Sequence, residues 1–352
     1  MSEVPSAASG ASAASAASAA PAAALPDRQV SGRTLLRDLM VLLPAAIVIA
    51  GLCSLVGQVE MSGAIWQMRL MRLATAATVG AGLSVAGLAL QGLLRNPLAE
   101  PYVLGIASGS GVGVLIGAAL AGAWGLAGWA TQPVLALAGA LATCLAVYLI
   151  AQRRGRLDPY VLLLSGVIIN VFNGALMLAI LLVVNPNDII SFVGWGMGMI
   201  RDTTSPLLLA VCAGAVVAGW LVIFLRGAWF NALSLGDEVA GSVGVSVHGL
   251  RLITFLVTAL MTAGAVALAG PVGFVGLVVP HLCRLIIGPD HRRGALVTSL
   301  AGAVFLMLAD TLCRLAGDWL NVGIVPVGVV TALVGGPFFI VLLRRRSAGG
   351  LA

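Results

Sequence analysis

Apolar runs fill almost the whole of this sequence between about residues 38 and 343. The chain is 60% hydrophobic and only 9% charged, whereas a soluble domain carries about a quarter charged residues. A run of about 20 apolar residues matches the thickness of the hydrocarbon core of a bilayer. Inside that core the backbone must satisfy its own polar groups, which continuous helices do. The sequence therefore predicts an all-α, polytopic membrane protein.

Ten membrane spans are predicted. Spans two to five and seven to ten are candidates for an inverted repeat, because Thr75-Ala76 and Ala86-Gly87 recur at the same offset as Thr258-Ala259 and Ala269-Gly270. The eighth span is short and contains Pro280. The predicted boundaries lie at roughly 39–57, 73–93, 102–121, 133–151, 160–184, 206–226, 250–270, 272–288, 295–316 and 326–343.

Charge predicts which way the chain is inserted. All 19 basic residues are arginines, and only Arg69, Arg72, Arg201 and Arg314 fall on the arginine-poor side of the predicted spans. The arginine-rich side is therefore predicted to be cytoplasmic, and an even number of spans puts both termini there. The net charge of +6 is then a sign of topology. Membrane lipid is a predicted partner and nucleic acid is not.

The chain divides into a membrane domain and two tails. Residues 1–36, rich in Ala and Ser, are predicted to be a disordered cytoplasmic tail, and residues 347–352 a second cytoplasmic tail. The membrane domain is predicted to cover residues 37–346, with a long cytoplasmic connection at 227–248.

Some chemistry is disfavoured by the composition. The chain has no lysine, so it cannot form the Gly-Lys-Ser/Thr motif of a phosphate-binding loop, and any ATPase must be another polypeptide. The five cysteines lie in apolar runs, and the three histidines are far apart without companion acids. We predict no metal site and no cofactor bound by this chain.

Span three carries a stripe of glycines. Gly105, Gly109, Gly113 and Gly117 recur every four residues, which places them on one helix face. Small residues let helix backbones approach closely in lipid, where no hydrophobic force drives helices together. The stripe predicts a tightly packed partner helix.

The connection between spans two and three is predicted to be a rigid, non-helical turn. Pro97 and Pro101 are four residues apart, and each restricts the backbone around it. Asn96 and Glu100 place polar groups in this turn, at the predicted cytoplasmic mouth.

A patterned segment lies in the connection between spans six and seven. Ser234 is predicted to cap a short helix with Asp237 and Glu238 in its first turn, where the helix dipole favours acids. The alternative is a helix lying on the lipid surface, but the segment has no Lys or Arg to meet anionic headgroups. Its residues are Leu233, Ser234, Leu235, Gly236, Asp237, Glu238, Val239 and Ala240.

Charges on the predicted outer side leave two interpretations open. Arg69 and Arg72 share a helix face at the start of span two, and Arg314 ends span nine four residues after Asp310. An acid at the depth of Asp310 should be paired or functional. One interpretation is a local Asp310–Arg314 ion pair with two arginines that reach to the surface. The other is a docking site for an acidic partner.

Span five has one polar face. Asn170, Asn173 and Met177 lie at helical spacing on the same side of the span. Amides inside a membrane face protein or a water-lined cavity. Both a transport pathway and hydrogen bonding between helices fit this pattern.

Four sequence blocks together resemble one family. They are Gln91 to Gly105, Gly270 to Arg292, Leu308 to Arg314 and Pro326 to Phe339, in order within about residues 60–345. This arrangement resembles the FecCD-like permeases of type II ABC importers, which carry cobalamin, haem and ferric siderophores. One departure is Met71, where the family usually has proline between the paired arginines.

The resemblance implies a function. The chain would be a non-enzymatic permease subunit in a bacterial inner membrane, importing an iron chelate or a corrinoid. ATP and Mg²⁺ would be bound and ATP hydrolysed on two separate ATPase subunits. The other implied partners are a second copy of the chain, with which it forms a homodimer, and a periplasmic substrate-binding protein.

The resemblance also implies roles for particular residues. The segment from Leu233 to Ala240 would couple to the ATPase, and Arg69, Arg72 and Arg314 would receive acidic residues of the binding protein. The gates and pathway would include Asn96, Leu98, Pro159, Tyr160, Asn170, Asn173, Met177 and Gly335. Pro159 and Tyr160 replace the small hydroxyl residues of the cobalamin branch, which favours an iron chelate over a corrinoid.

Two other classes of function fit the sequence less well. An ion-coupled secondary transporter would need buried acids as coupling sites, and Asp310 is the only acid well inside a predicted span. A membrane-embedded enzyme would need a catalytic cluster, and the sequence has no paired aspartates or His–acid group at matched depth. The sequence does not identify the substrate.

Overall fold

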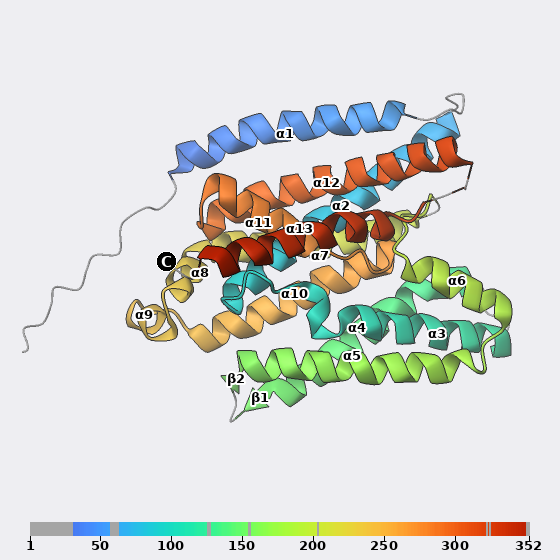
Figure 1. The fold of residues 1–352 in the computed structure, drawn as a ribbon, viewed down its shortest axis with the longest axis horizontal. Helices are drawn as coiled ribbons and strands as arrows, with labels where there is room; N and C mark the ends of the chain where they lie inside the picture. The colour runs from blue at the N-terminus through green and yellow to red at the C-terminus, as the bar shows by residue number, and fades with distance from the viewer. Residues whose placement is uncertain are drawn as a thin grey trace, which may run out of the picture.

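The computed structural model describes residues 31–56, 63–124, 128–153, 156–202, 204–321, 323 and 325–349. In these residues the chain forms a bundle of helices (Figure 1). A two-stranded antiparallel hairpin joins α4 to α5, with β1 at Gln152–Arg153 and β2 at Arg156–Leu157. The helices are α1 Gly32–Leu55, α2 Gly63–Leu93, η1 Pro101–Leu104, α3 Ile106–Trp124, α4 Gly128–Ala151, α5 Pro159–Leu181, α6 Pro186–Gly196, α7 Pro206–Leu225, α8 Gly227–Ser234, α9 Asp237–Ser242, α10 Val247–Ala269, α11 Val275–Ile287, α12 His291–Leu320 and α13 Val327–Gly349.

Each predicted span coincides with a helix, so the predicted fold class is confirmed. Seven helices are long and apolar enough to cross a membrane, and three shorter apolar helices lie in α3, α11 and α13. The ends of the spans differ from the prediction. Helix α1 begins inside the predicted first tail, because the Ser31 side chain accepts a hydrogen bond from the Arg33 backbone N–H. Helix α13 continues to Gly349, and residues 1–30 and 350–352 lie outside the described residues.

The surface of the bundle is unusually apolar. Large side chains such as Met40 on α1, Val171 on α5 and Leu333 on α13 are 65%, 70% and 70% exposed. Water would disfavour so much apolar area on a monomer, whereas lipid tails would not. The exposed faces of these helices therefore fit a membrane environment.

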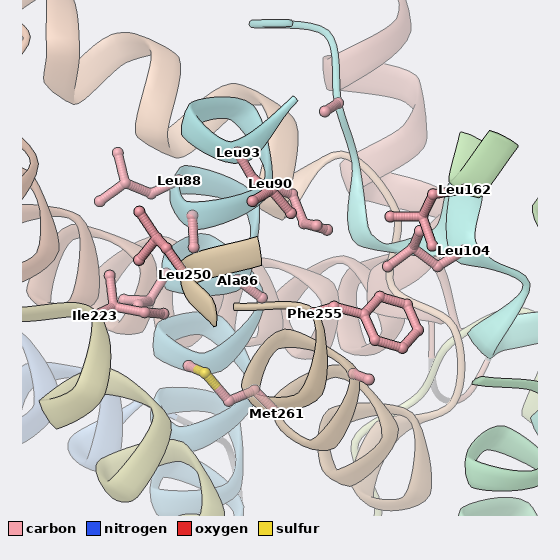
Figure 2. Close-up of a cluster of buried hydrophobic side chains, with 14 of the residues drawn as sticks. Ala86, Leu88, Leu90, Leu93, Leu104, Leu162, Ile223, Leu250, Phe255 and Met261 are labelled. Atoms are coloured by element: carbon pink, nitrogen blue, oxygen red, sulfur yellow. The ribbon is translucent and has the colours of Figure 1, made fainter. Parts of the chain in front are cut away.

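Helices α2 and α10 form the centre of the bundle. In their most apolar windows, 78% and 72% of residues are buried, compared with 22% in α1 and α5. Figure 2 shows how side chains from α2, η1, α5, α7 and α10 meet in one apolar cluster. Phe255 and Leu250 of α10 lie in it beside Leu90 of α2 and Leu104 of η1, each at most 1% exposed.

The glycine stripe of α3 packs against α4, as predicted. A Cβ built on Gly113 would lie 2.0 Å from the Leu135 carbonyl oxygen, and one on Gly109 would lie 2.6 Å from the Gly139 carbonyl oxygen. Gly139 in turn faces the Gly109 backbone. The two backbones are therefore in direct contact, which only residues without a side chain allow.

Two breaks in the helical backbone lie at corresponding positions of the predicted repeat. The first separates α2 from α3 at residues 94–105, apart from the short helix η1, and the second separates α10 from α11 at 270–274. They meet inside the protein, where the Val272 backbone N–H donates to the Tyr102 hydroxyl at 3.0 Å. The repeat itself stays a prediction.

Candidate coupling, gate and docking sites

The predicted coupling segment folds into the two short helices α8 and α9 (Figure 1), at the end of the bundle that also holds the first turn of α1. Asp237 and Glu238 lie in the first turn of α9, as predicted. The prediction that Ser234 caps this helix is wrong. Its hydroxyl donates to the Asn231 carbonyl at 2.6 Å and so closes the end of α8. Gly236 precedes α9 instead, with a φ of 132° that glycine adopts without strain.

One face of the coupling segment is buried against the rest of the bundle, and the other face is exposed. Leu233 and Ala240 are fully buried against the bundle. Leu235, Val239 and Val243 are 58%, 37% and 49% exposed. An exposed apolar face next to acidic residues is typical of a surface that another protein covers.

Asp237 ties this segment to two other parts of the chain. One carboxylate oxygen accepts a hydrogen bond from the Arg95 guanidinium, and the other accepts one from Arg251 of α10 at 2.7 Å. Arg95 also donates from Nε to the Leu233 carbonyl at 2.8 Å. Sequence analysis missed Arg95, because its partner lies more than a hundred residues away and no local pattern joins the two.

The predicted gate residues Asn96 and Leu98 lie in the same turn as Arg95. The Asn96 side-chain oxygen accepts from the Leu98 N–H at 3.0 Å, and the Asn96 N–H donates to the Gln91 carbonyl at 3.2 Å. Both side chains are half-buried. The rigid, non-helical turn predicted from the two prolines is therefore present. A gate role for these residues stays a prediction.

Glu100 connects this turn to α11. Its Oε1 accepts a hydrogen bond from the Phe274 backbone N–H at 2.7 Å. Burial raises the pKa of the Glu100 carboxyl, and the hydrogen bond from Phe274 partly offsets that rise. Phe274 has a left-handed φ of 67°, and its ring packs on Gly335 of α13, where an added Cβ would lie 2.3 Å from Cγ. A predicted pathway residue, Gly335, thus contacts the second helix break.

The polar face of α5 turns into the bundle. Asn173 donates to Ser108 of α3 at 3.0 Å and to Thr143 of α4 at 3.2 Å. Asn170 accepts from the same Ser108 hydroxyl at 2.7 Å, and Met177 fills the space above Gly111 of α3. Neighbouring helices of the same chain thus engage the polar and sulfur atoms of Asn170, Asn173 and Met177, and hydrogen bonding between helices is present. A pathway role for these three residues stays a prediction.

Pro159 and Tyr160 open α5 at the same end of the bundle as the coupling segment. The Asp158 side chain caps this helix by accepting from the Tyr160 N–H at 2.9 Å. Tyr160 is 75% exposed. Its ring lies on the bundle surface, so within one copy of the chain it does not close a pathway.

Arg72 lies in a buried ion-pair cluster in the N-terminal part of α2. Its guanidinium makes two parallel hydrogen bonds to Asp310, at 2.8 and 2.9 Å, and a third to Asp202 at 2.7 Å. The Arg72 and Asp310 side chains are 4% and 1% exposed. Asp310 therefore pairs mainly with Arg72, while Arg314 lies 3.7 Å away. The predicted local pair between Asp310 and Arg314 is thus present as the weaker of two ion pairs. The prediction that Arg69 and Arg72 reach to the surface is wrong, because both are buried.

Arg69 and Arg314 hold the end of α1. Arg69 donates to the Ser54 carbonyl at 3.1 Å, and Arg314 donates to the Cys53 and Val56 carbonyls at 3.2 and 3.3 Å. The last carbonyls of a helix have no partner within the helix, and arginine side chains often satisfy them. Docking by Arg69, Arg72 and Arg314 stays a prediction. Each would have to exchange an internal partner for a carboxylate of the binding protein.

The arrangement of helices and helix breaks has close counterparts among known proteins. A family model described as the FecCD transport family matches residues 38–345. The chain belongs to the FecCD transport family. This confirms the resemblance found in the four sequence blocks.

Curated relatives of this FecCD chain are transport permeases. It is 37% identical over 284 residues to the uncharacterized ABC transporter permease protein YvrB of Bacillus subtilis (strain 168), covering 80% of this chain and 79% of the relative. It is 38% identical to the cobalamin import system permease protein BtuC of Halobacterium salinarum, with 81% and 74% covered. It is 37% identical to the hemin transport system permease protein HmuU of Yersinia pestis, with 80% and 84% covered.

A solved structure shows the same fold. The FecCD chain matches an ABC transporter in an inward-facing conformation with a TM-score of 0.78 and 28% sequence identity, covering 88% of this chain and 99% of that chain. These relatives are transport permeases and not enzymes. Within the part of the chain that the structure describes, no three His, Cys, Asp or Glu side chains gather as a metal site.

Proposed function

We propose that this chain is the membrane-spanning subunit of an ATP-driven importer for an iron chelate (a ferric siderophore or haem) or a corrinoid. A periplasmic binding protein delivers the substrate, and two separate ATPase subunits bind ATP and Mg²⁺. Membership of the FecCD family and the similarity to cobalamin and hemin permeases support this proposal. The replacement of small hydroxyl residues by Pro159 and Tyr160 favours an iron chelate.

The exposed apolar face of the coupling segment carries the proposal. Leu235, Val239 and Val243 present uncovered apolar area at a polar end of the bundle, which favours a protein partner there. The ATPase subunits would seat on this face and move it as they open and close. Both termini would then be cytoplasmic, because α1 begins and α13 ends at the same end of the bundle as α8 and α9 (Figure 1).

A second copy of the chain would complete the pathway. The outward face of α5 is apolar, and Tyr160 stands exposed at its cytoplasmic end. Two copies related by a two-fold axis would bring such faces together around a shared channel. The gates would be formed by residues 96–98 and 159–160 of both copies, with Gly335 of α13 beside the channel.

The surroundings of Asp310 give less support to an ion-coupled transporter. A coupling acid must bind and release an ion during the cycle. Asp310 accepts two hydrogen bonds from Arg72 and is 1% exposed, which favours a structural role for this pair.

Substitutions on the exposed face test the proposal. Val239→Asp and Val243→Asp should leave folding unchanged, because both side chains are exposed, but should abolish co-purification with the ATPase subunit of the importer. The exposed residue Val211 on α7 supplies a control, since Val211→Thr lies far from the coupling segment and should not affect the complex. An undiminished complex with both aspartate variants would refute the assignment of this surface.

A further inference from the structure

We propose that Arg95 transmits movement of the coupling segment to the gate loop, defined here as residues 94–100. This inference rests on the proposed function and assigns to one residue a positioning role. Three sets of contacts support it, and they run from the coupling segment through the gate loop to α13.

The first set joins Arg95 to both helices of the coupling segment. Its guanidinium binds the Asp237 carboxylate in the first turn of α9, and its Nε binds the Leu233 carbonyl near the end of α8. Arg95 therefore spans the α8–α9 junction. A displacement of either short helix would pull on the same guanidinium.

The second set makes the gate loop move as one piece. Arg95 itself has a φ of 47°, and its N–H donates to the Gly92 carbonyl at 3.4 Å. Asn96 bonds to Gln91 before it and to Leu98 after it, and the Ala99 N–H donates to the Asn96 carbonyl at 3.0 Å. With Pro97 limiting the remaining backbone freedom, a shift at Arg95 reaches Leu98 without being absorbed.

The third set continues from the loop to the far helix. Glu100 ends the gate loop and accepts from the Phe274 N–H at 2.7 Å. The Phe274 ring packs directly on the Gly335 backbone of α13, leaving no space for a side chain there. The proposed ATPase surface and the proposed pathway helix are thus joined by continuous contacts across both helix breaks.

The Arg95–Asp237 ion pair is better suited to transmitting movement than to stabilising the fold. The Arg95 and Asp237 side chains are 39% and 44% exposed, and exposed ion pairs contribute little to folding stability. Substitutions at either position should therefore leave a folded protein, which makes the role testable. Contiguous contacts alone do not establish coupling, so the test must measure coupling itself.

The experiment uses the complete transporter in proteoliposomes and measures ATP hydrolysed per solute imported. Arg95→Gln and Asp237→Asn should each retain ATP hydrolysis and raise this ratio at least about fivefold, the lower range of measured couplings between sites. The double variant should raise the ratio by less than the product of the two single effects, because both substitutions remove the Arg95–Asp237 ion pair and each also affects one further contact. Arg95→Lys, which keeps a cation opposite Asp237, should recover part of the coupling.

Controls separate this inference from the function on which it rests. Arg33→Gln removes an exposed arginine at the same end of the bundle, without an ion pair among the described residues, and should leave the ratio unchanged. In hydrogen–deuterium exchange, adding the ATPase should alter protection of residues 94–100 in the wild type but not in Arg95→Gln.

Two outcomes would overturn the inference. One is a wild-type ratio in Arg95→Gln, and the other is loss of the ATPase complex in that variant, which would assign Arg95 to assembly. Absence of ATP-driven uptake by the wild type would instead count against the proposed function.

Discussion

Arg72 and Asp310 form a bidentate ion pair in which both side chains are almost completely buried. Removing one partner of such a pair leaves an uncompensated buried charge, which costs about 3–5 kcal/mol. Asp310→Ala should therefore lower the thermal unfolding midpoint in detergent strongly, since Asp202 alone remains to pair with Arg72. Asp318→Ala removes an exposed acid from the same helix and should have little effect. Equal midpoints for the two variants would contradict the structural role of the pair.

Glu100 offers a second test at a single residue. Glu100→Gln keeps a side-chain oxygen that can accept from the Phe274 N–H, and it avoids the cost of burying a charge. Glu100→Ala leaves that N–H without its acceptor, which costs about 1–3 kcal/mol when the donor is buried. Thermal unfolding should rank the wild type and Glu100→Gln together and Glu100→Ala lower. A midpoint for Glu100→Gln as low as that of Glu100→Ala would mean that the charge, and not the hydrogen bond, is what matters.

Sequence reasoning found these residues but not their partners. Asp310 was recognised as an acid that needs a counter-charge, yet only Arg314 was visible as a neighbour four residues away. The true partner, Arg72, precedes it by 238 positions and reaches it through the packing of α2 on α12. The amides of α5 are a different case. Their spacing identified the face correctly, but the direction in which that face points depends on where α3 and α4 pack.

The contact between α3 and α4 allows a test at the level of helices. Gly113→Ala would place a methyl group 2.0 Å from the Leu135 carbonyl oxygen, so the helices must separate. Overpacking of this kind costs about 1–3 kcal/mol. Gly174 of α5 is a matched control, because a Cβ there meets nothing within 4 Å. Thermal unfolding should show Gly113→Ala destabilised and Gly174→Ala not, whereas equal midpoints would contradict the close packing.

Helices were easier to predict than the breaks between them. Among the described residues, hydropathy identified the seven long apolar helices and the three shorter ones, because a span must stay apolar over most of a bilayer thickness. The small helix α6 was not predicted, because its 11 residues are too few to be recognised as a membrane span by hydropathy. The predicted spans at 250–270 and 272–288 leave almost no connection, whereas the structure has a break at 270–274. Contacts with Tyr102 and Glu100, which lie far away in the sequence, hold this break in place.

At the scale of the whole molecule, an apolar exterior surrounds two central helices, and a small acidic segment with an exposed apolar face stands at one end (Figure 1). The family match and the helical bundle follow from sequence patterns that are local or ordered along the chain. The identity of the substrate does not follow from such patterns. In our proposal, a second copy and a separate binding protein contribute residues that surround the substrate.

Solute uptake by reconstituted vesicles tests the central claim most directly. The vesicles would contain this chain, the proposed ATPase subunit and the proposed binding protein loaded with a ferric siderophore, haem or a corrinoid. The account predicts accumulation against a gradient only when the ATPase subunit and hydrolysable ATP are both present. Uphill accumulation by this chain alone, without any nucleotide, would contradict it.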